Sequence, residues 1–420
     1  MRYLRFVLIL AGISLLLGTL SACQGAGQGV TEDTSDTKDT AVSQDTATTA
    51  EEVTETTETT APDEDYVYQV TDRAGEDGLD FIIDFPAGKD ITILQITDTQ
   101  MQTMAGVRNE NRHIQVGNAF FSVLPDDFEF RVWRYMDEAV AKSSPDLIVL
   151  TGDNIYGELD DSGQMWLSLI QKMDSYGIPW CVVFGNHDNE SGKGVQWQVE
   201  QLLSSQYCIF RQGDVAGNSN YNLLIRQGGE AKYLLYMLDS NGCQTRPGNP
   251  GEGMMPDNVD IDKIDPAAGF RRNQISWLTN SSEDVQDVYG QVPVLMFFHI
   301  PPIEAVQYTN NTYGAATSHF PFVPTLEGDL GMSREVYGGA SSTRFWKTAQ
   351  DMGCVGMFVG HQHEIATSIM CDGIRVTYGL KTSTYDYHAE DMLGSTKITI
   401  FQDSNEFAVT YLPTELTYQP

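Results

Sequence analysis

The chain has 420 residues, and its 58 Asp and Glu residues against 25 Lys and Arg residues give a formal net charge of −33 at neutral pH. A charge of this size and sign argues against nucleic acid or an anionic membrane surface as an electrostatic partner. A phosphate-bearing substrate would need local positive charge, for which bound metal is the obvious source. The length permits one large domain or two to three ordinary ones.

The N-terminal segment Met1–Ala22 has the pattern of a secretory signal peptide. A positive start is followed by the apolar run Phe6–Leu17 and then by small residues. The segment Leu20–Cys23 resembles a bacterial lipobox, in which cleavage precedes Cys23 and the thiol is lipidated. The alternative is an ordinary secretory signal with an incidental cysteine. The pattern predicts a bacterial lipoprotein, extracytoplasmic and anchored to the cell membrane by the lipid on Cys23.

Residues 23–65 are almost all small, polar or acidic, and none of them is aromatic. Such a segment cannot bury enough apolar surface to offset its ordering entropy, so a disordered acidic tether is expected. An acidic interaction tail is the alternative. The expected organisation is therefore a signal peptide over 1–22, a tether over 23–65 and a folded domain over 66–420.

From about residue 66 onward, apolar strand-like runs alternate with helical patterns, which is typical of an α/β fold. Strands are expected at Ile91–Ile96, Asp146–Leu150, Trp180–Phe184, Lys232–Leu238, Val292–Phe298 and Cys354–Val359. The spacing of apolar residues predicts helices at Arg131–Ser143 and Met165–Met173, with weaker candidates at Val195–Leu203 and Arg344–Met352.

Three alternating segments near the C-terminus are expected to pair antiparallel at one side of the core: Ile374–Tyr378, Lys397–Phe401 and Phe407–Leu412. Two long connections, 101–130 and 304–342, lack clear periodicity, and loops of this length are usually functional or disordered. We expect them to wall a cleft. Candidate phosphate or leaving-group contacts within them are Arg108, Arg112, His113 and His319, each of which has a solvated surface residue as its alternative.

The cysteines do not show a zinc-binding spacing. Once the N-terminal cysteine is set apart, five remain, an odd number for an oxidising compartment. Cys181 and Cys354 lie in apolar runs and are expected to be small buried residues. Any disulfide among Cys208, Cys243 and Cys371 is left open.

Five of the apolar runs end in side chains that can bind metal or move protons. The ends are Asp98-Thr99-Gln100, Gly152-Asp153-Asn154, Asn186-His187-Asp188, His299 and His361-Gln362-His363. A single such end could be an ordinary polar turn. The repetition favours a site, because α/β enzymes keep their chemistry at the ends of strands.

The donors at these ends suit two adjacent divalent metal ions. They are Asp98, Gln100, Asp153, Asn186, His299, His361 and His363. With both aspartates ionised and the other donors neutral, two divalent ions leave about two positive charges uncompensated, which suits a phosphate and lowers the pKa of a bridging water. Alternate residues of an extended segment share a side, so the two histidines of the last end could address two neighbouring ions.

Taken in order, these motifs resemble the five-motif signature of the calcineurin-like metallophosphoesterases, over about Ile91 to Thr384. Three segments resemble more closely the purple-acid-phosphatase-like branch found in plants, fungi and bacteria: Gly185–Glu190, Phe297–Pro301 and Tyr378–Thr382. The resemblance implies an α/β fold, a four-layer αββα sandwich of two mixed β-sheets flanked by helices. It places a dinuclear site at the strand ends.

The resemblance also implies residue roles. The first metal would be held by Asp98, Gln100, Asp153 and His363, and the second by Asp153, Asn186, His299 and His361, with Asp153 bridging. His187 would bind no metal and would stabilise or protonate the leaving oxygen, with Asp188 as its orienting partner.

The sequence departs from the family pattern at Gln100, where most members have histidine. A Gln carbonyl is a weaker, harder ligand than imidazole, which favours Mn, Mg or Fe over Zn. Tyr156 matches the position from which purple acid phosphatases bring a tyrosinate to ferric iron, although those enzymes have no side-chain ligand where Gln100 stands. Tyr156 is therefore either a ligand or a buried aromatic residue beside the site, and we favour Gln100 as the ligand.

The resemblance implies a metal-dependent phosphoesterase with two divalent or trivalent ions (Mn, Fe, Mg or Zn), in which a metal-bound hydroxide attacks phosphorus and His187 assists the leaving group. A small phosphomonoester is the preferred substrate, and a phosphodiester or nucleotide is the alternative. The alternative of another class is a non-catalytic surface lipoprotein that acts as a binding module. A degenerate domain usually loses a motif histidine or the bridging aspartate, whereas here only Gln100 departs.

Overall fold

The structure is a computed structural model that describes residues 67–102, 114–116, 119–121, 131–157, 162–242, 269–313, 330–333 and 344–415. The predicted signal peptide, Cys23 and the tether lie outside the described residues, as do Arg108, Arg112, His113, His319 and Cys243. The chain divides into Met1–Thr59 and Thr60–Pro420, and all described residues belong to the second unit. Among them, none of the helices combines the length and apolarity needed to cross a membrane.

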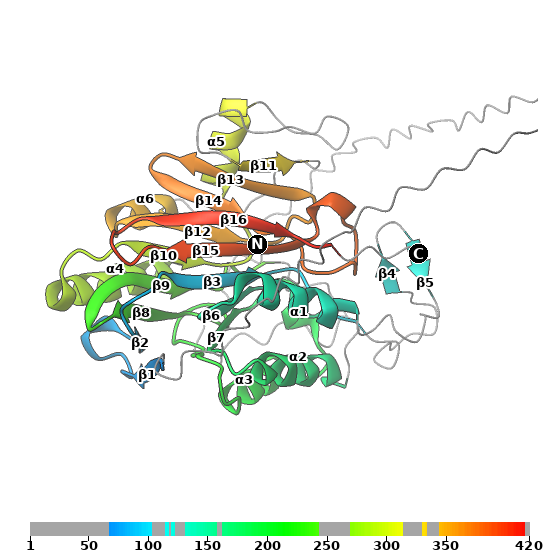
Figure 1. Ribbon diagram of the computed structural model, residues 1–420, viewed down its shortest axis with the longest axis horizontal. Coiled ribbons are helices and arrows are strands. Elements are labelled where there is room, and N and C mark those ends of the chain that lie inside the picture. Colours follow the sequence, from blue (N-terminus) through cyan, green and yellow to red (C-terminus); the bar gives the residue numbers. More distant parts are fainter. Residues whose placement is uncertain are drawn as a thin grey trace, which may run out of the picture. The chain divides into compact units, whose positions relative to one another are not determined.

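Two mixed β-sheets form the centre of the second unit (Figure 1). The first sheet has nine strands in the order β1 (Gln69–Asp72), β2 (Phe81–Phe85), β8 (Tyr221–Gln227), β9 (Glu230–Met237), β10 (Val294–Phe297), β12 (Cys354–Val359), β14 (Ile374–Tyr378), β13 (Ile365–Cys371) and β11 (Leu330–Ser333). The second has five in the order β16 (Phe407–Pro413), β15 (Gly394–Ile400), β3 (Ile91–Ile96), β6 (Leu147–Thr151) and β7 (Trp180–Val183). The short strands β4 (Ile114–Val116) and β5 (Ala119–Phe121) pair with each other.

Each sheet contains a run of parallel strands: β9, β10, β12 and β14 in the first, and β3, β6 and β7 in the second. Helices lie in several of the connections between strands. They are α1 (Arg131–Ser143), α2 (Gln164–Ser175), α3 (Val195–Leu203), α4 (Arg272–Tyr289), α5 (Ile303–Tyr313) and α6 (Phe345–Asp351). Parallel strands deliver their carboxyl ends to one edge of a sheet, so the topology gathers the chemistry-bearing strand ends.

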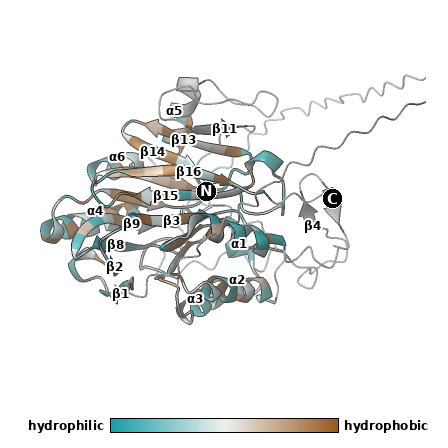
Figure 2. Ribbon diagram, viewed as in Figure 1, coloured by the Kyte–Doolittle hydropathy of each residue, from teal (hydrophilic) through white to brown (hydrophobic). Residues whose placement is uncertain are grey.

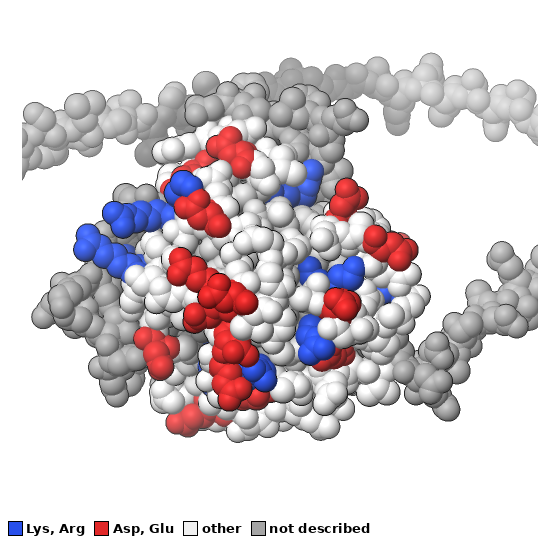
Figure 3. Space-filling model, turned by 90° about the vertical axis from the view of Figure 1, so that its left-hand side faces the viewer, with Lys and Arg blue, Asp and Glu red and all other residues white. Residues whose placement is uncertain are grey.

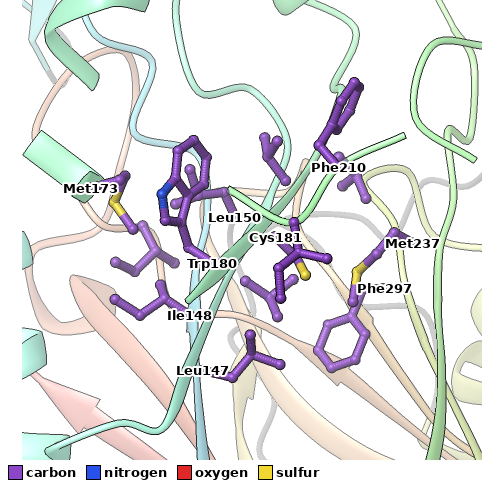
Figure 4. Close-up of a cluster of buried hydrophobic side chains, with 14 of the residues drawn as sticks. Leu147, Ile148, Leu150, Met173, Trp180, Cys181, Phe210, Met237 and Phe297 are labelled. Carbon is purple, nitrogen blue, oxygen red and sulfur yellow. The ribbon is translucent and has the colours of Figure 1, made fainter. Parts of the chain in front are cut away.

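Side-chain alternation along the first sheet separates two apolar cores. Leu223 and Ile225 of β8 face the second sheet, while Leu224 faces the helices on the opposite side. Figure 4 shows part of the core around the second sheet: Cys181 of β7 lies near Met237 and Phe297 of the first sheet, whereas Ile148 of β6 and Trp180 of β7 lie on the opposite face, near Met173 of α2. The other face of the second sheet is covered by α1, α2 and α3. In Figure 2 the strands are largely hydrophobic, whereas the helices carry both hydrophilic and hydrophobic residues. The result is the predicted four-layer αββα arrangement.

Most predicted elements are present, and α1, α3, β3 and β12 have the predicted bounds. One prediction about the C-terminal strands is wrong. β15 and β16 pair antiparallel at the edge of the second sheet, but β14 lies within the first sheet, parallel to β12 and antiparallel to β13. Its alternation comes from Arg375, which is only partly buried and hydrogen-bonds across to Ser368. Helix α5 also occupies the start of the connection 304–342, which was predicted to be irregular.

Charged side chains of both signs are dispersed over the face shown in Figure 3, where the Lys and Arg residues of the described part lie among Asp and Glu. In the described part of the chain, several such residues form ion pairs, such as the exposed pair of Lys347 and Asp351. Exposed pairs of this kind contribute little to stability, typically about 0–1 kcal/mol each.

Candidate metal centre

The loops that end the strands are held in unusual backbone conformations. Asp98, Gln100, Asp153 and His361 all have positive φ, at 52°, 39°, 49° and 74°. Non-glycine residues adopt this region rarely, and such strain is concentrated at functional sites. Four of the sequence-predicted metal-site residues are therefore held in a rarely populated conformation.

Two glycines in the motifs are required by close packing rather than by conformation. A Cβ on Gly185 would lie 2.2 Å from both the backbone nitrogen and Oδ1 of Asp153, and a Cβ on Gly360 would lie 2.1 Å from Thr97 Oγ1 and 2.5 Å from Asp98 Oδ2. The absence of a side chain at these positions lets the strand ends approach the two buried aspartates.

The structure brings the aspartates and histidines of four motifs together in two groups. One group is Asp153, His299 and His361, the other is Asp98, Asp153 and His363, and within each group the potential ligand atoms lie within 4.8 Å of one another. Asp153 belongs to both groups. The Asp153 carboxylate therefore has the position that is expected of a ligand shared by two adjacent ions.

The donor atoms fit metal ions. His299 Nδ1 lies 2.9 Å from the Thr151 carbonyl oxygen, and His363 Nδ1 lies 2.9 Å from the Tyr387 carbonyl oxygen. A ring nitrogen that faces a carbonyl must donate, so each neutral imidazole presents the lone pair of Nε2 to the site.

Two buried polar atoms in the site lack a hydrogen-bond partner in the described structure, His299 Nε2 and Asn186 Oδ1. His299 Nε2 does lie 3.1 Å from Asp153 Oδ2, but this close approach does not have hydrogen-bond alignment. Buried polar groups without partners are rare, and a missing ion is one standard reason for them. The two orphaned atoms thus support the same interpretation as the donor set.

Charges within the site perturb its titratable groups strongly. Burial raises the pKa of Asp98, but the hydrogen bond with His363 and the positive charge of His299 outweigh it and lower the pKa to about 2. Burial lowers the pKa of His299, while the neighbouring Asp153 more than offsets this and raises it to about 9. A metal ion bound at this site would compete with a proton for Nε2 of His299.

His187 follows β7 and stands beside the two groups. Its Nδ1 lies 2.8 Å from Glu190 Oε2, and its ring stacks on Tyr156 with ring centroids 4.4 Å apart. Its backbone N–H donates to Asp153 Oδ1 at 2.9 Å. The ring is therefore fixed by a carboxylate on one edge and an aromatic face, and it remains 21% exposed.

The expectation that Asp188 orients His187 is wrong, because Glu190 makes that contact. The Asp188 carboxylate accepts hydrogen bonds from Gly185 N–H at 2.7 Å, Ile155 N–H at 3.0 Å and Asn154 Nδ2 at 3.0 Å. It ties the loop after β6 to the loop after β7. Asp188 is thus a buried structural carboxylate beneath the site.

Gln100 lies at the site, but its amide is engaged. Its Oε1 accepts a hydrogen bond from the Lys381 ammonium at 2.9 Å, and its Nε2 lies 3.4 Å from Asp153 Oδ2. The oxygen that was expected to face a metal therefore faces a cation instead.

Three further residues at the site had no role assigned from sequence. Glu190 and Lys381 lay within the segments that resemble the purple-acid-phosphatase-like branch, which was the available signal. Asp386, with a φ of 60° and its Oδ2 3.8 Å from His363 Nδ1, lies in a loop that offers no periodicity. Cys181, Cys208, Cys354 and Cys371 are free thiols, so among the described residues no disulfide forms.

The chain is similar to several known proteins. The chain is 25% identical over 281 residues to "Probable inactive purple acid phosphatase 28" of Arabidopsis thaliana, covering 64% of this chain and 66% of that protein. It is 24% identical over 337 residues to "Probable inactive purple acid phosphatase 29" of the same plant, covering 74% and 75%. With "Phosphatase DCR2" of Saccharomyces cerevisiae the identity is 27%, over 43% of this chain and 30% of that protein. The chain thus spans just under two thirds of the first relative and three quarters of the second.

Among solved structures, a purple acid phosphatase from yellow lupin seeds aligns with a TM-score of 0.42 and 9% identity, over 79% of this chain and 53% of that one. A dimetal phosphatase from Danio rerio aligns with a TM-score of 0.40 and 13% identity, over 77% and 99%. These likenesses are too distant to carry a functional argument. The family described as "Calcineurin-like phosphoesterase" matches residues 91–364, which contain the strand ends that meet at the site. The chain belongs to the calcineurin-like phosphoesterase family.

Proposed function

We propose that this protein is a metal-dependent phosphoesterase that hydrolyses small phosphate esters, with phosphomonoesters preferred. The observation that carries the proposal is the pair of donor groups that share the buried Asp153. A strongly acidic chain needs local positive charge to bind a phosphate group. A pair of metal ions would provide that charge.

The proposed ligands are Asp98, Asp153 and His363 for one ion and Asp153, Asn186, His299 and His361 for the other. When bound, the two ions (Mn, Fe, Mg or Zn) supply the positive charge that attracts a phosphate and the acidity that makes water a nucleophile near neutral pH. The protein holds the donors in place before binding: Asp98, for example, accepts the backbone N–H of His361 at 3.1 Å. The strand ends are thereby tied to each other as well as to the ions.

His187 is the proposed acid for the leaving group. Glu190 holds Nδ1, which leaves Nε2 as the atom that gives a proton to the departing oxygen. The stacked Tyr156 ring limits rotation of the imidazole. His187 does not belong to either donor group, in keeping with a role in proton transfer rather than in metal binding.

Two alternatives use the same site. A phosphodiester or nucleotide would need the same donors and the same acid. A non-catalytic binding module is the alternative of another class, and the names of the two plant relatives, which call them probably inactive, give it weight. The donor set of this chain favours the enzyme, because both groups have an aspartate and at least one histidine.

The test is a panel of phosphomonoesters and phosphodiesters assayed after metal stripping and reconstitution with Mn²⁺, Mg²⁺, Fe or Zn²⁺. We expect turnover to disappear on stripping and to return on reconstitution, with monoesters hydrolysed faster than diesters. Faster diester turnover would select the first alternative. Metal uptake without turnover of any ester would select the binding module.

Tyr156 is not expected to be a ligand, because its ring lies flat against His187. The purified protein should be colourless, and Tyr156→Phe, which keeps the stacking surface, should change turnover by less than about threefold, within the range of a weak aromatic contact. Visible absorption and steady-state kinetics check this. A charge-transfer band that vanishes in Tyr156→Phe while iron remains bound would establish a tyrosinate ligand instead.

For localisation we propose that the mature protein is a lipoprotein outside the cytoplasm, anchored through Cys23. The support is the sequence pattern around Leu20–Cys23. The full chain expressed in bacteria should partition into the detergent phase, and Cys23→Ala should leave it unlipidated and abolish that partitioning. Mature wild-type protein that is free of lipid would contradict the proposal.

A further inference from the structure

Lys381 is a buried cation whose role the proposed function leaves open. It follows β14 of the first sheet, yet its backbone is attached to the second sheet through a bridge to Thr97 and through the Gly394 N–H, which donates to the Lys381 carbonyl at 2.9 Å. The next residue, Thr382, donates its N–H to the Thr97 carbonyl at 3.0 Å. With only 1% of its surface exposed, Lys381 has little freedom to move its side chain.

The ammonium of Lys381 points at the first strand end of the site. Its Nζ donates to the backbone carbonyl of Asp98 at 2.8 Å and to Gln100 Oε1 at 2.9 Å. A lysine ammonium has donors and no acceptor, so it can face only the oxygen of the amide. The amide nitrogen of Gln100 must then lie on the side of Asp153, where it is 3.4 Å from Oδ2.

This orientation removes Gln100 from the set of available ligands. The carbonyl oxygen is the only ligand atom that the side chain offers, and it is bonded to a cation. Turning the amide around would place its NH₂ group against the ammonium, with two donors in contact and a buried bond lost. The nitrogen that faces Asp153 carries its hydrogens and has no lone pair for a metal.

The charge of Lys381 also reaches the residues of one donor group. Its Nζ lies 2.8 Å from the backbone oxygen of Asp98, a member of the group Asp98, Asp153 and His363. Asp98 and His363 do not belong to the other group, which is Asp153, His299 and His361. A fixed positive charge next to the first group opposes binding of a cation there.

We propose that Lys381 is a positioning residue that withholds Gln100 from the metal, so that the site Asp98, Asp153 and His363 holds its ion more weakly than the site Asp153, Asn186, His299 and His361. The inference rests on the proposed metal centre and adds an asymmetry to it. One ion is retained by the purified protein, and the other exchanges with the medium.

The test is titration of the metal-stripped full-length protein with Mn²⁺ by isothermal calorimetry, with the metal content measured after dialysis. The wild type should show one tight and one weak site. Gln100→Leu should leave both affinities within about twofold, because the residue contributes no ligand. Lys381→Met should raise the Mn²⁺ affinity of the weak site by at least about tenfold. Removing one unit charge near a divalent ion has an effect of this size even in a water-like dielectric.

Lys381→Met can raise the affinity of the weak site in two ways, by removing a charge and by freeing the Gln100 oxygen. In the double variant Gln100→Leu/Lys381→Met only the effect of the charge remains, so the two contributions are separated. Lys397→Met, on β15, is the matched control and should behave as wild type. Lys381→Arg keeps the charge and should also keep the weak site.

The outcomes distinguish this inference from the proposed function. If Gln100→Leu loses the weak site while the tight site remains, Gln100 is a ligand and the inference is wrong, but the metal centre stands. Two equally tight sites in the wild type would also contradict it. If Lys381→Met fails to fold, the Gln100→Leu titration decides alone. If the wild type binds no Mn²⁺, Mg²⁺, Fe or Zn²⁺, the proposed function fails together with the inference.

Discussion

Replacing Asp153 with alanine is expected to abolish turnover and to remove both ions, the largest effect of any single substitution in this chain. Asp153 is the one residue shared by the two donor groups, and it is buried with 1% of its surface exposed. Without it, each group loses its central carboxylate and the two groups lose their bridge. Metal content after dialysis and turnover on a phosphomonoester are the two measurements.

The backbone at Asp153 requires a second variant, because its φ of 49° disfavours alanine by about 1–2 kcal/mol. Asp153→Asn tolerates this conformation and removes only the charge, and the same loss of metal and turnover is expected. Asp372→Ala is the matched control. Its φ of 46° is similar, but it lies in the turn that precedes β14, at the opposite end of that strand from the site. Tight retention of both ions in Asp153→Asn would rule out the bridging role.

Replacing His187 with alanine should lower turnover by about 10² to 10⁴, the usual range for loss of an acid–base group, while metal content stays at the wild-type level. The imidazole lies outside both donor groups, so the ions lose no ligand. Esters with very good leaving groups should lose least, since their departing oxygen needs little protonation. The measurement is turnover across a series of esters of decreasing leaving-group quality.

Glu190→Gln tests the corrected partner of His187. The glutamine keeps the shape but loses the charge of the contact at 2.8 Å, and turnover should fall by roughly tenfold, the scale of one charge-assisted hydrogen bond. Loss of metal in His187→Ala would show that the imidazole is a ligand. An unchanged dependence on the leaving group would show that it gives no proton to the departing oxygen.

The sequence predicts where a strand lies along the chain better than it predicts which sheet the strand joins. The apolar runs at Ile91–Ile96 and Cys354–Val359 predicted buried strands with the observed bounds, because burial on both faces requires continuous hydrophobicity. The segment Ile374–Tyr378 also predicted a strand, but its position between β12 and β13 depends on pairing with residues distant in the sequence. Alternation alone does not specify which sheet a strand joins.

For this protein the sequence by itself determined the α/β class and the residues that meet at the strand ends, because buried parallel strands deliver their carboxyl ends to one edge whatever the loops do. Only the tertiary structure decided which groups those residues bind. Asp188 and Glu190 are both close to His187 in sequence, and the turn at Asp188–Glu190 aims one carboxylate down to Asn154 and the other at the imidazole. The Gln100 oxygen accepts a hydrogen bond from Lys381, which lies 281 positions later in the chain. The packing of the two sheets brings these two residues together.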